Sequence, residues 1–237
     1  MNVMADQVVL DLVDANNILF DRGVLDAYGH VSARDPEYPE RFFLARNMAP
    51  ALVAAEDIQS FDRNAETADE RPSYLERFIH AELYRARPDV MSVVHSHSAA
   101  VLPFSVVDRP LRAVSHMAGF LGVGAPVFEI RDSVGEASDL LIRNRDLGRS
   151  LAKSLGDAAV VLMRGHGSVA VGASVQQVVH RAVFTELNAR TQAEALGLGT
   201  CTYLTAEEAI AAAASNDGQV MRAWELWRRQ ARSKPAL

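Results

Sequence analysis

The side chains best suited to chemistry are histidines in two short segments, His95-Ser96-His97 and Gly165-His166-Gly167. Each follows a run of mostly apolar residues, 90–94 and 158–163, that predicts a buried strand. Histidines two apart on a strand point to one face, because side chains alternate with period two. A third imidazole at the end of another strand completes a set of three nitrogens, which suits Zn, Mn, Fe or Co and leaves positions open for a substrate. The pattern therefore favours a catalytic metal site over strand-end histidines that bond only to the backbone.

Strands and helices along the chain must position these histidines. Helical spacing and helix boundaries predict helices over 5–22, 74–85, 98–106, 146–155, 174–196 and 205–230, the last with a break near 215–218. Short strands are predicted at 30–33, 42–45, 90–94, 158–163 and 168–171, with an exposed loop at 62–71 and loop with short strand at 112–132. We find no repeat and no linker, so we expect one α/β domain of three layers over residues 1–237.

Composition narrows the classes of partner. The 237 residues carry a net charge of −6, with 30 acidic and 24 basic side chains and no dominant Lys/Arg cluster, which argues against nucleic acid. The one cysteine, Cys201, allows no intrachain disulfide, and we expect it to be a small half-buried residue. We see no signal peptide and no window of about 18 uninterrupted apolar residues. A cytoplasmic protein with no membrane partner is therefore expected.

Several short motifs together resemble the class II aldolase/adducin family, which includes fuculose-phosphate aldolase and ribulose-phosphate 4-epimerase. The motifs are Tyr74-Leu75-Glu76, Arg87-Pro88-Asp89, Val93-Val94-His95-Ser96-His97 and Gly165-His166-Gly167. The likeness runs from the first predicted helix to about Leu204. It implies a central, largely antiparallel sheet between helical layers, and a homotetramer with active sites near subunit interfaces. It also implies that His95, His97 and His166 ligate a divalent metal ion.

The same resemblance makes Glu76 the active-site carboxylate. Three neutral imidazoles leave a metal ion its full positive charge, so that it can act as a Lewis acid. A carboxylate beside it can move a proton or hold the resting metal. Read without the family spacing, Glu76 would be a solvated acid on a helix face. Glu82 is the competing candidate on the same helix, and we expect it to be a surface acid.

The substrate-binding positions depart from those of the sugar-phosphate enzymes. Gly29-His30, Asn47-Met48 and Tyr74-Leu75 stand where small hydroxyl and amide donors surround a phosphate in those relatives. By resemblance, His30, Arg46, Asn47 and Tyr74 would bind the substrate here. Arg46 would clamp a carboxylate in bidentate fashion, and the alternative for it is a solvated surface arginine.

By the same resemblance, His116 stands where the aldolases have the tyrosine that they use as a proton donor. An imidazole titrates near neutral pH and can give or take a proton at a carbon centre. If the family assembly holds, His116 would reach the site from a neighbouring subunit; otherwise it is a structural histidine. We interpret His80 and His180, which lie on predicted helices, as structural.

A narrower likeness points to a branch acting on aromatic acids, which includes hydroxy-methylpyridine-dicarboxylate and dihydroxyphthalate decarboxylases. It rests on residues 28–32, 46–50 and 116–120. The leading hypothesis is a metal-dependent, non-oxidative decarboxylase of a hydroxylated aromatic or pyridine dicarboxylate, with Zn or Mn favoured. One alternative is an aldolase, epimerase or dehydratase of a sugar or sugar phosphate. Others are an iron-dependent oxygenase and a non-catalytic, adducin-type binding module.

Overall fold

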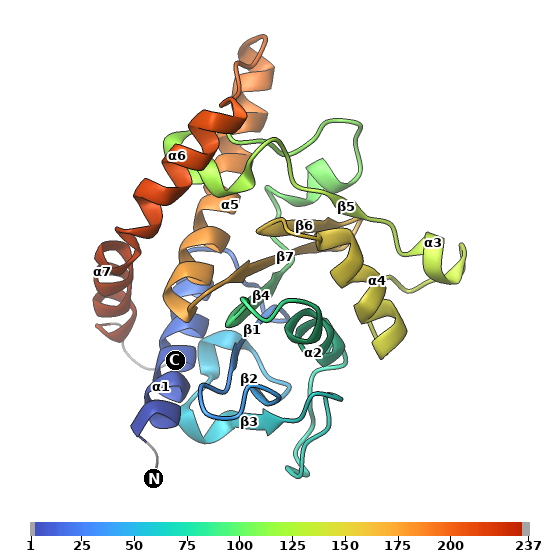
Figure 1. Ribbon diagram of the computed structural model, residues 1–237, viewed down its shortest axis with the longest axis vertical. Helices are drawn as coiled ribbons and strands as arrows, with labels where there is room; N and C mark the ends of the chain where they lie inside the picture. Colours follow the sequence, from blue (N-terminus) through green and yellow to red (C-terminus); the bar gives the residue numbers. More distant parts are fainter. Residues whose placement is uncertain (1–2, 234–237) are drawn as a thin grey trace.

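A seven-stranded sheet forms the centre of the molecule, and a computed structural model describes it within residues 3–233 (Figure 1). The strands are β1 (His30–Arg34), β2 (Phe42–Ala45), β3 (Ile58–Phe61), β4 (Ser92–Ser96), β5 (Val127–Phe128), β6 (Val160–Met163) and β7 (Gly167–Gly172). Their order is β3-β2-β1-β4-β7-β6-β5. Only β5 and β6 pair in parallel, so the largely antiparallel sheet is confirmed.

Helices cover both faces of this sheet. They are α1 (Val3–Asp21), α2 (Arg77–Ala86), α3 (Arg131–Val134), α4 (Arg145–Leu155), α5 (Val175–Leu198), α6 (Ala206–Asp217) and α7 (Val220–Arg232). Short 3₁₀ turns η1 (Pro50–Leu52), η2 (Ala55–Asp57), η3 (Leu102–Ser105) and η4 (His116–Leu121) lie between them. In Figure 1, α1, α5 and α7 lie together on one side of the sheet, while α2 and α4 pack together on the other. The three-layer prediction is therefore confirmed.

Because side chains alternate along the strands, the sheet contributes residues to two hydrophobic cores, one on each face. On β6, Val160 and Leu162 belong to the core beneath α1 and α5, whereas Val161 and Met163 belong to the core beneath α2 and α4. On β1, Val31 and Ala33 face the α1–α5 core, so the alternate residues of that strand face α2. Because both cores lie on one sheet, we propose that residues 1–237 form a single domain.

Three helices begin where the sequence predicts. Asn144, Ser174 and Thr205 are the N-caps of α4, α5 and α6, and each side chain accepts a backbone N–H from the first turn. Such caps stabilise a helix by about 1 kcal/mol each, because they satisfy otherwise unpaired donors. The predicted break near 215–218 separates α6 from α7.

Other predicted boundaries are wrong. The helix over 98–106 is only the 3₁₀ turn η3, because Pro103 lacks the N–H that a continuing helix requires. The helix predicted from Tyr74 begins at Arg77, with Glu76 at the N-cap and a side chain directed into the site. Strand β3 went unpredicted, because its four residues mix polar and apolar types too evenly to form a clear pattern.

Glu82 is not a surface acid. Its side chain is buried on α2, where one carboxylate oxygen meets Arg145 Nε at 2.8 Å and the other meets Arg85 Nε at 3.4 Å. Arg145 begins α4, so this ion pair joins the two helices of one layer. A buried carboxylate needs such partners, because removing a charge from water without compensation is costly.

Two predictions from composition can be compared directly with the structure. Cys201 is partly buried and forms no disulfide, as expected. Among the helices within residues 3–233, none combines the length and the apolar character needed to cross a bilayer.

Candidate metal centre

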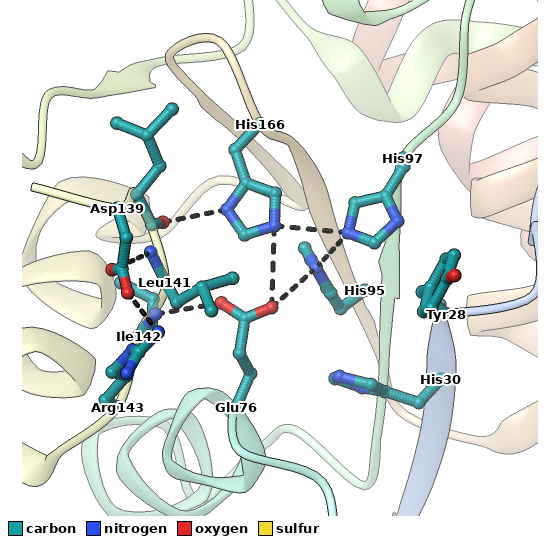
Figure 2. Close-up of polar contacts among 12 residues, drawn as sticks. Tyr28, His30, Glu76, His95, His97, Asp139, Leu141, Ile142, Arg143 and His166 are labelled. Carbon is teal, nitrogen blue, oxygen red and sulfur yellow. Dashed lines mark hydrogen bonds and ion pairs between the residues drawn. The ribbon is translucent and has the colours of Figure 1, made fainter. Parts of the chain in front are cut away.

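Four side chains bring their ligand atoms to one point between β4, α2 and the β6–β7 turn (Figure 2). Nε2 of His97 lies 3.2 Å from Nε2 of His95 and 3.1 Å from Nε2 of His166. Glu76 Oε2 lies 3.4 Å from Nε2 of both His95 and His166. These are the four residues that the sequence analysis assigned to the metal and its carboxylate.

The strands and one helix end set this arrangement. His95 lies within β4, where it pairs with His30 of β1 and shares a face with Val93. His97 follows one residue after the end of β4, and His166 lies in the turn that joins β6 to β7. Glu76 is the N-cap residue of α2, so the sheet and the helix each supply part of the cluster.

Glycines allow the histidine turn to approach β4 closely. Gly165 has φ +67°, a left-handed conformation that favours glycine. A Cβ on Gly167 would lie 2.2 Å from the carbonyl oxygen of Ser96, which no packing adjustment of a side chain could relieve. The two strands therefore bring His166 beside His97 only because residue 167 has no side chain.

The second nitrogen of each histidine fixes its tautomer. Nδ1 of His95 faces the Ser168 carbonyl at 3.2 Å, and Nδ1 of His166 faces the Leu140 carbonyl at 2.9 Å. Nδ1 of His97 faces a carboxylate oxygen of Asp26 at 3.0 Å. These oxygens only accept hydrogen bonds, so each Nδ1 must donate its proton. In the neutral rings the three Nε2 lone pairs are then directed at one another and at the Glu76 carboxylate.

Such a convergence of electron pairs fits a divalent cation. An ion about 2.1 Å from two ligand atoms separates them by about 3.0 Å at a right angle and about 3.4 Å at a tetrahedral angle. The four separations in the cluster, 3.1–3.4 Å, fall within that interval. Three neutral imidazoles and one carboxylate suit Zn, Mn, Fe or Co, and hydrogen-bonded Nδ1 atoms are usual for metal-bound histidines.

The protonation of the cluster also favours a cation. Burial lowers the pKa of His166 to about 4, with nearby His95 adding to the effect, and burial likewise lowers the pKa of His97. Burial alone would raise the pKa of Glu76, but the adjacent imidazoles and the Ile142 N–H outweigh it and bring that pKa to about 2. At neutral pH His97 and His166 are therefore neutral and Glu76 is ionised, the forms that bind metals.

The segment 139–142 holds two of these ligands through backbone atoms (Figure 2). The Leu140 carbonyl accepts the Nδ1 proton of His166, and Ile142 N donates to Glu76 Oε1 at 2.8 Å. Leu140 has φ +69°, which a leucine adopts only at an energetic cost. This segment was not predictable from side-chain types, because its contacts to the ligands come from backbone groups.

Asp26 is a further residue that sequence reasoning missed. Its Oδ2 accepts from His97, while its Oδ1 accepts from the backbone N–H groups of Tyr28 and Gly29 at 2.8 and 2.9 Å. The aspartate thereby closes the turn before β1 and orients a ligand. A turn-forming Asp ahead of Tyr28-Gly29 was a usable local signal, but its partner His97 lies 71 residues away.

His30 and Tyr74, both predicted to bind substrate, lie together beside the cluster. The ring of His30 is 4.6 Å from that of Tyr74 and 5.1 Å from that of His95. Both residues are buried, and the Tyr74 hydroxyl donates to the Met48 carbonyl. Burial raises the pKa of Tyr74 to about 12, so its hydroxyl stays protonated in that bond.

Arg46 and Asn47 lie on the loop after β2. Arg46 Nε donates to Asp57 at 2.7 Å, and about a third of its side chain is exposed. Within residues 3–233, its two terminal nitrogens make no hydrogen bond, so the guanidinium is only partly engaged. Asn47 is exposed, and its N–H donates to the Pro72 carbonyl, which joins this loop to the segment that carries Tyr74.

His116 does not join the cluster of its own chain. It is exposed on η4, which packs against α6, and its carbonyl accepts from Asn216. His180 is buried between the rings of Phe120 and Phe184, as suits the structural role predicted for it.

Comparisons with known proteins agree with this geometry. Residues 10–193 match the class II aldolase and adducin N-terminal domain. The chain is 38% identical to decarboxylase tropJ of Talaromyces stipitatus over 255 aligned residues, covering 97% of this chain and 96% of that protein. It is 30% identical to a 3,4-dihydroxyphthalate decarboxylase of Terrabacter sp., covering 79% of this chain and 81% of that protein.

A solved L-fuculose 1-phosphate aldolase has the same fold. It superposes with a TM-score of 0.76 at 20% identity, covering 89% of this chain and 96% of that one. At this identity the likeness speaks for the fold alone. Together with the match over 10–193, it leads to one conclusion: the chain belongs to the class II aldolase and adducin family.

Proposed function

We propose that the protein is a metal-dependent decarboxylase that releases CO₂ from a hydroxylated aromatic or pyridine carboxylic acid. The observation that carries the proposal is the set of four converging ligand atoms in a chain that is 38% identical to a decarboxylase over nearly its whole length. The name of the Terrabacter relative specifies a dihydroxylated aromatic dicarboxylate, which supports this substrate class.

Glu76, His95, His97 and His166 would hold one divalent ion, with Zn or Mn favoured. When bound, the ion supplies positive charge that stabilises the electrons left on the substrate as a carbon–carbon bond breaks. The protein holds the three imidazoles in their ligating tautomer through Ser168, Asp26 and Leu140.

In the proposed reaction, the bond between the ring and its carboxylate carbon breaks and CO₂ leaves. The electron pair stays on the ring carbon, which takes up a proton in its place. Glu76 or His116 would move that proton. The low pKa of Glu76 makes it a carboxylate at neutral pH, which suits a ligand or a proton acceptor. His116 is therefore the better proton donor.

His116 can fill that role only if another copy of the chain supplies it. It is exposed on η4 and has no contact with its own cluster within the described residues. We therefore propose a homotetramer in which His116 reaches the site of a neighbouring subunit, as the family resemblance implies.

Recognition of an aromatic acid is proposed for His30, Arg46, Asn47 and Tyr74. The paired rings of His30 and Tyr74 offer an aromatic wall where the sugar-phosphate enzymes have small polar groups. The terminal nitrogens of Arg46 would pair with a carboxylate of the substrate.

A panel assay tests the proposal. The protein, loaded in turn with Zn, Mn, Fe and Co, is incubated with hydroxyphthalates and hydroxypyridine dicarboxylates under air and under nitrogen, and CO₂ and ring products are measured. Oxygen-independent CO₂ release from at least one acid is expected. No CO₂ across the panel, with cleavage of fuculose phosphate instead, would establish the aldolase alternative. Release only with iron and oxygen would establish an oxygenase.

A further inference from the structure

A stripe of polar side chains leads from the metal cluster into the layer between β1 and α2. Glu76, His80 and Tyr84 are spaced four residues apart and lie on one face of α2. His30 and Ser32 are two apart on β1 and face the same layer. Four residues rise about 6.0 Å along a helix and two rise about 6.8 Å along a strand, so the two rows stay in register.

These rows form one continuous chain of hydrogen bonds. The Tyr84 hydroxyl lies 2.7 Å from Ser32 Oγ, and Ser32 Oγ lies 2.6 Å from His80 Nδ1. His80 Nε2 then lies 2.7 Å from His30 Nδ1. All four residues are buried, with exposed fractions of 0–6%. The chain ends at His30, beside the ring of the ligand His95.

The contacts of the two imidazoles favour their neutral forms. Where His80 Nε2 meets His30 Nδ1, one of the two nitrogens must accept, so the rings cannot both be fully protonated. Neither has a hydrogen-bonded carboxylate among the described residues that could stabilise a charged ring. Each ring therefore carries one proton, on either Nδ1 or Nε2.

Tyr84 fixes which nitrogen carries the proton. Burial raises the pKa of the Tyr84 phenol, which therefore keeps its proton at all ordinary pH values. Within residues 3–233 the only acceptor for that proton is Ser32 Oγ. Ser32 Oγ could also accept from His80 Nδ1, but its own proton would then have no acceptor within the same residues, because the hydroxyl contacts only Tyr84 and His80 there. Ser32 therefore donates to His80 Nδ1, and His80 Nε2 donates to His30 Nδ1. The reverse direction leaves the Tyr84 proton without an acceptor, which disfavours it by about tenfold or more.

We propose that Tyr84, Ser32 and His80 are positioning residues that hold His30 with its proton on Nε2, as a hydrogen-bond donor to an anionic oxygen of the substrate. Nε2 of His30 has no protein partner within the described residues and keeps a small accessible surface, although the residue as a whole is only 2% exposed. In Figure 2 the His30 ring extends from β1 toward Glu76 and His95. A carboxylate or phenolate oxygen bound there accepts this N–H, whereas a cationic group is rejected.

That the His30 N–H binds an acidic substrate rests on the proposed function, but the direction of the hydrogen bonds from Tyr84 to His30 does not. The test therefore measures the tautomer of His30 in zinc-loaded protein without substrate, from ¹⁵N–¹H correlations of the imidazole nitrogens. The His30 signals are identified by their absence in His30→Gln. The expected result is a protonated Nε2 and an unprotonated Nδ1. A proton on Nδ1 would overturn the proposal.

Ser32→Ala tests whether the hydrogen bonds from Tyr84 to His30 set the tautomer of His30. It removes the donor to His80 Nδ1, so both directions become equally favourable and His30 should show a mixture of tautomers. Ser92→Ala is the matched control, because Ser92 is an equally buried serine on the opposite face of the sheet, and its hydroxyl donates to the backbone carbonyl of Ser32 without entering the side-chain hydrogen bonds. An unchanged tautomer in Ser32→Ala would overturn the role of the chain. Should Ser32→Ala fail to fold, Tyr84→Phe keeps the ring and removes the proton that sets the direction.

The second measurement is the affinity of the zinc-loaded protein for phthalate, determined by calorimetry. A half-populated donor form weakens binding about twofold in Ser32→Ala, with zinc affinity unchanged and with no change in Ser92→Ala. Phthalate binding that is equal in all three proteins would contradict the donor role. If no aromatic acid is decarboxylated although His30 carries its proton on Nε2, the proposed function is wrong, but the positioning role of Tyr84, Ser32 and His80 is retained.

Discussion

Replacing Asp26 with Asn should weaken metal binding through a residue that does not touch the metal. Asp26 uses both carboxylate oxygens as acceptors, one for His97 Nδ1 and one for the N–H groups of Tyr28 and Gly29. An amide offers only one acceptor oxygen. In Asp26→Asn, an NH₂ group must therefore face either His97 or the two backbone donors. Facing His97, it favours the tautomer with the proton on Nε2, which cannot ligate.

The size of the effect follows from exposure. Loss of a partner that orients a metal-bound histidine typically lowers affinity 10–100-fold. The Asp26 side chain is 46% exposed, so water can replace part of the interaction and the lower end applies. We expect about a tenfold loss of zinc affinity, equivalent to about 1.4 kcal/mol.

Competition with a chromophoric chelator at pH 7 measures this loss. Asp35→Asn is the matched control, because Asp35 accepts the N–H groups of Glu37 and Tyr38 in a similar turn but contacts no ligand. Its zinc affinity should stay within about twofold of the wild type. Wild-type affinity in Asp26→Asn, or an equal loss in both variants, would show that Asp26 does not orient His97 for metal binding.

Other predictions address the turn, the ligands and the buried histidine. Gly167→Ala should lower the free energy of unfolding by about 1–3 kcal/mol and weaken zinc binding, because its Cβ meets a Ser96 carbonyl; urea titration and zinc titration measure both. His95→Ala should abolish metal binding and activity together, whereas His116→Ala should retain the metal and lose turnover. Full turnover in His116→Ala would exclude it from the mechanism. The pKa of His80 is about 3 in the folded protein, so as the pH falls below 6.5 only the unfolded chain takes up a proton at this residue. This lowers the free energy of unfolding by about 2 kcal/mol at pH 5. In metal-free His80→Gln, that part of the dependence of unfolding free energy on pH should disappear.

The ligand set was predictable because its spacing is local and its types are distinctive. Two histidines two apart on a strand and a third in a glycine-flanked turn indicate a shared site, and family resemblance added Glu76. Their supporting contacts were not predictable. Asp26, Leu140 and Ile142 meet their partners 71, 26 and 66 residues away, and two of the three act through backbone atoms.

Two further contacts were not predictable, for related reasons. Glu82 was expected at the surface because its partner Arg145 lies 63 residues later, and no local pattern announces that pairing. His80 was expected to be structural because it matches no family position. Its spacing of four residues from Glu76 was a usable signal, but its contact with His30 becomes visible only when α2 is placed on β1.

We propose that aromatic acids lose CO₂ at the cluster of Glu76, His95, His97 and His166. The most direct measurement is CO₂ release by chelator-treated protein as one divalent metal is added back. We expect no release without metal and a rise to a plateau at about one equivalent per chain, since four ligands form one site. Undiminished release after complete removal of the metal, or stoichiometric binding without CO₂ from any acid of the panel, would contradict it.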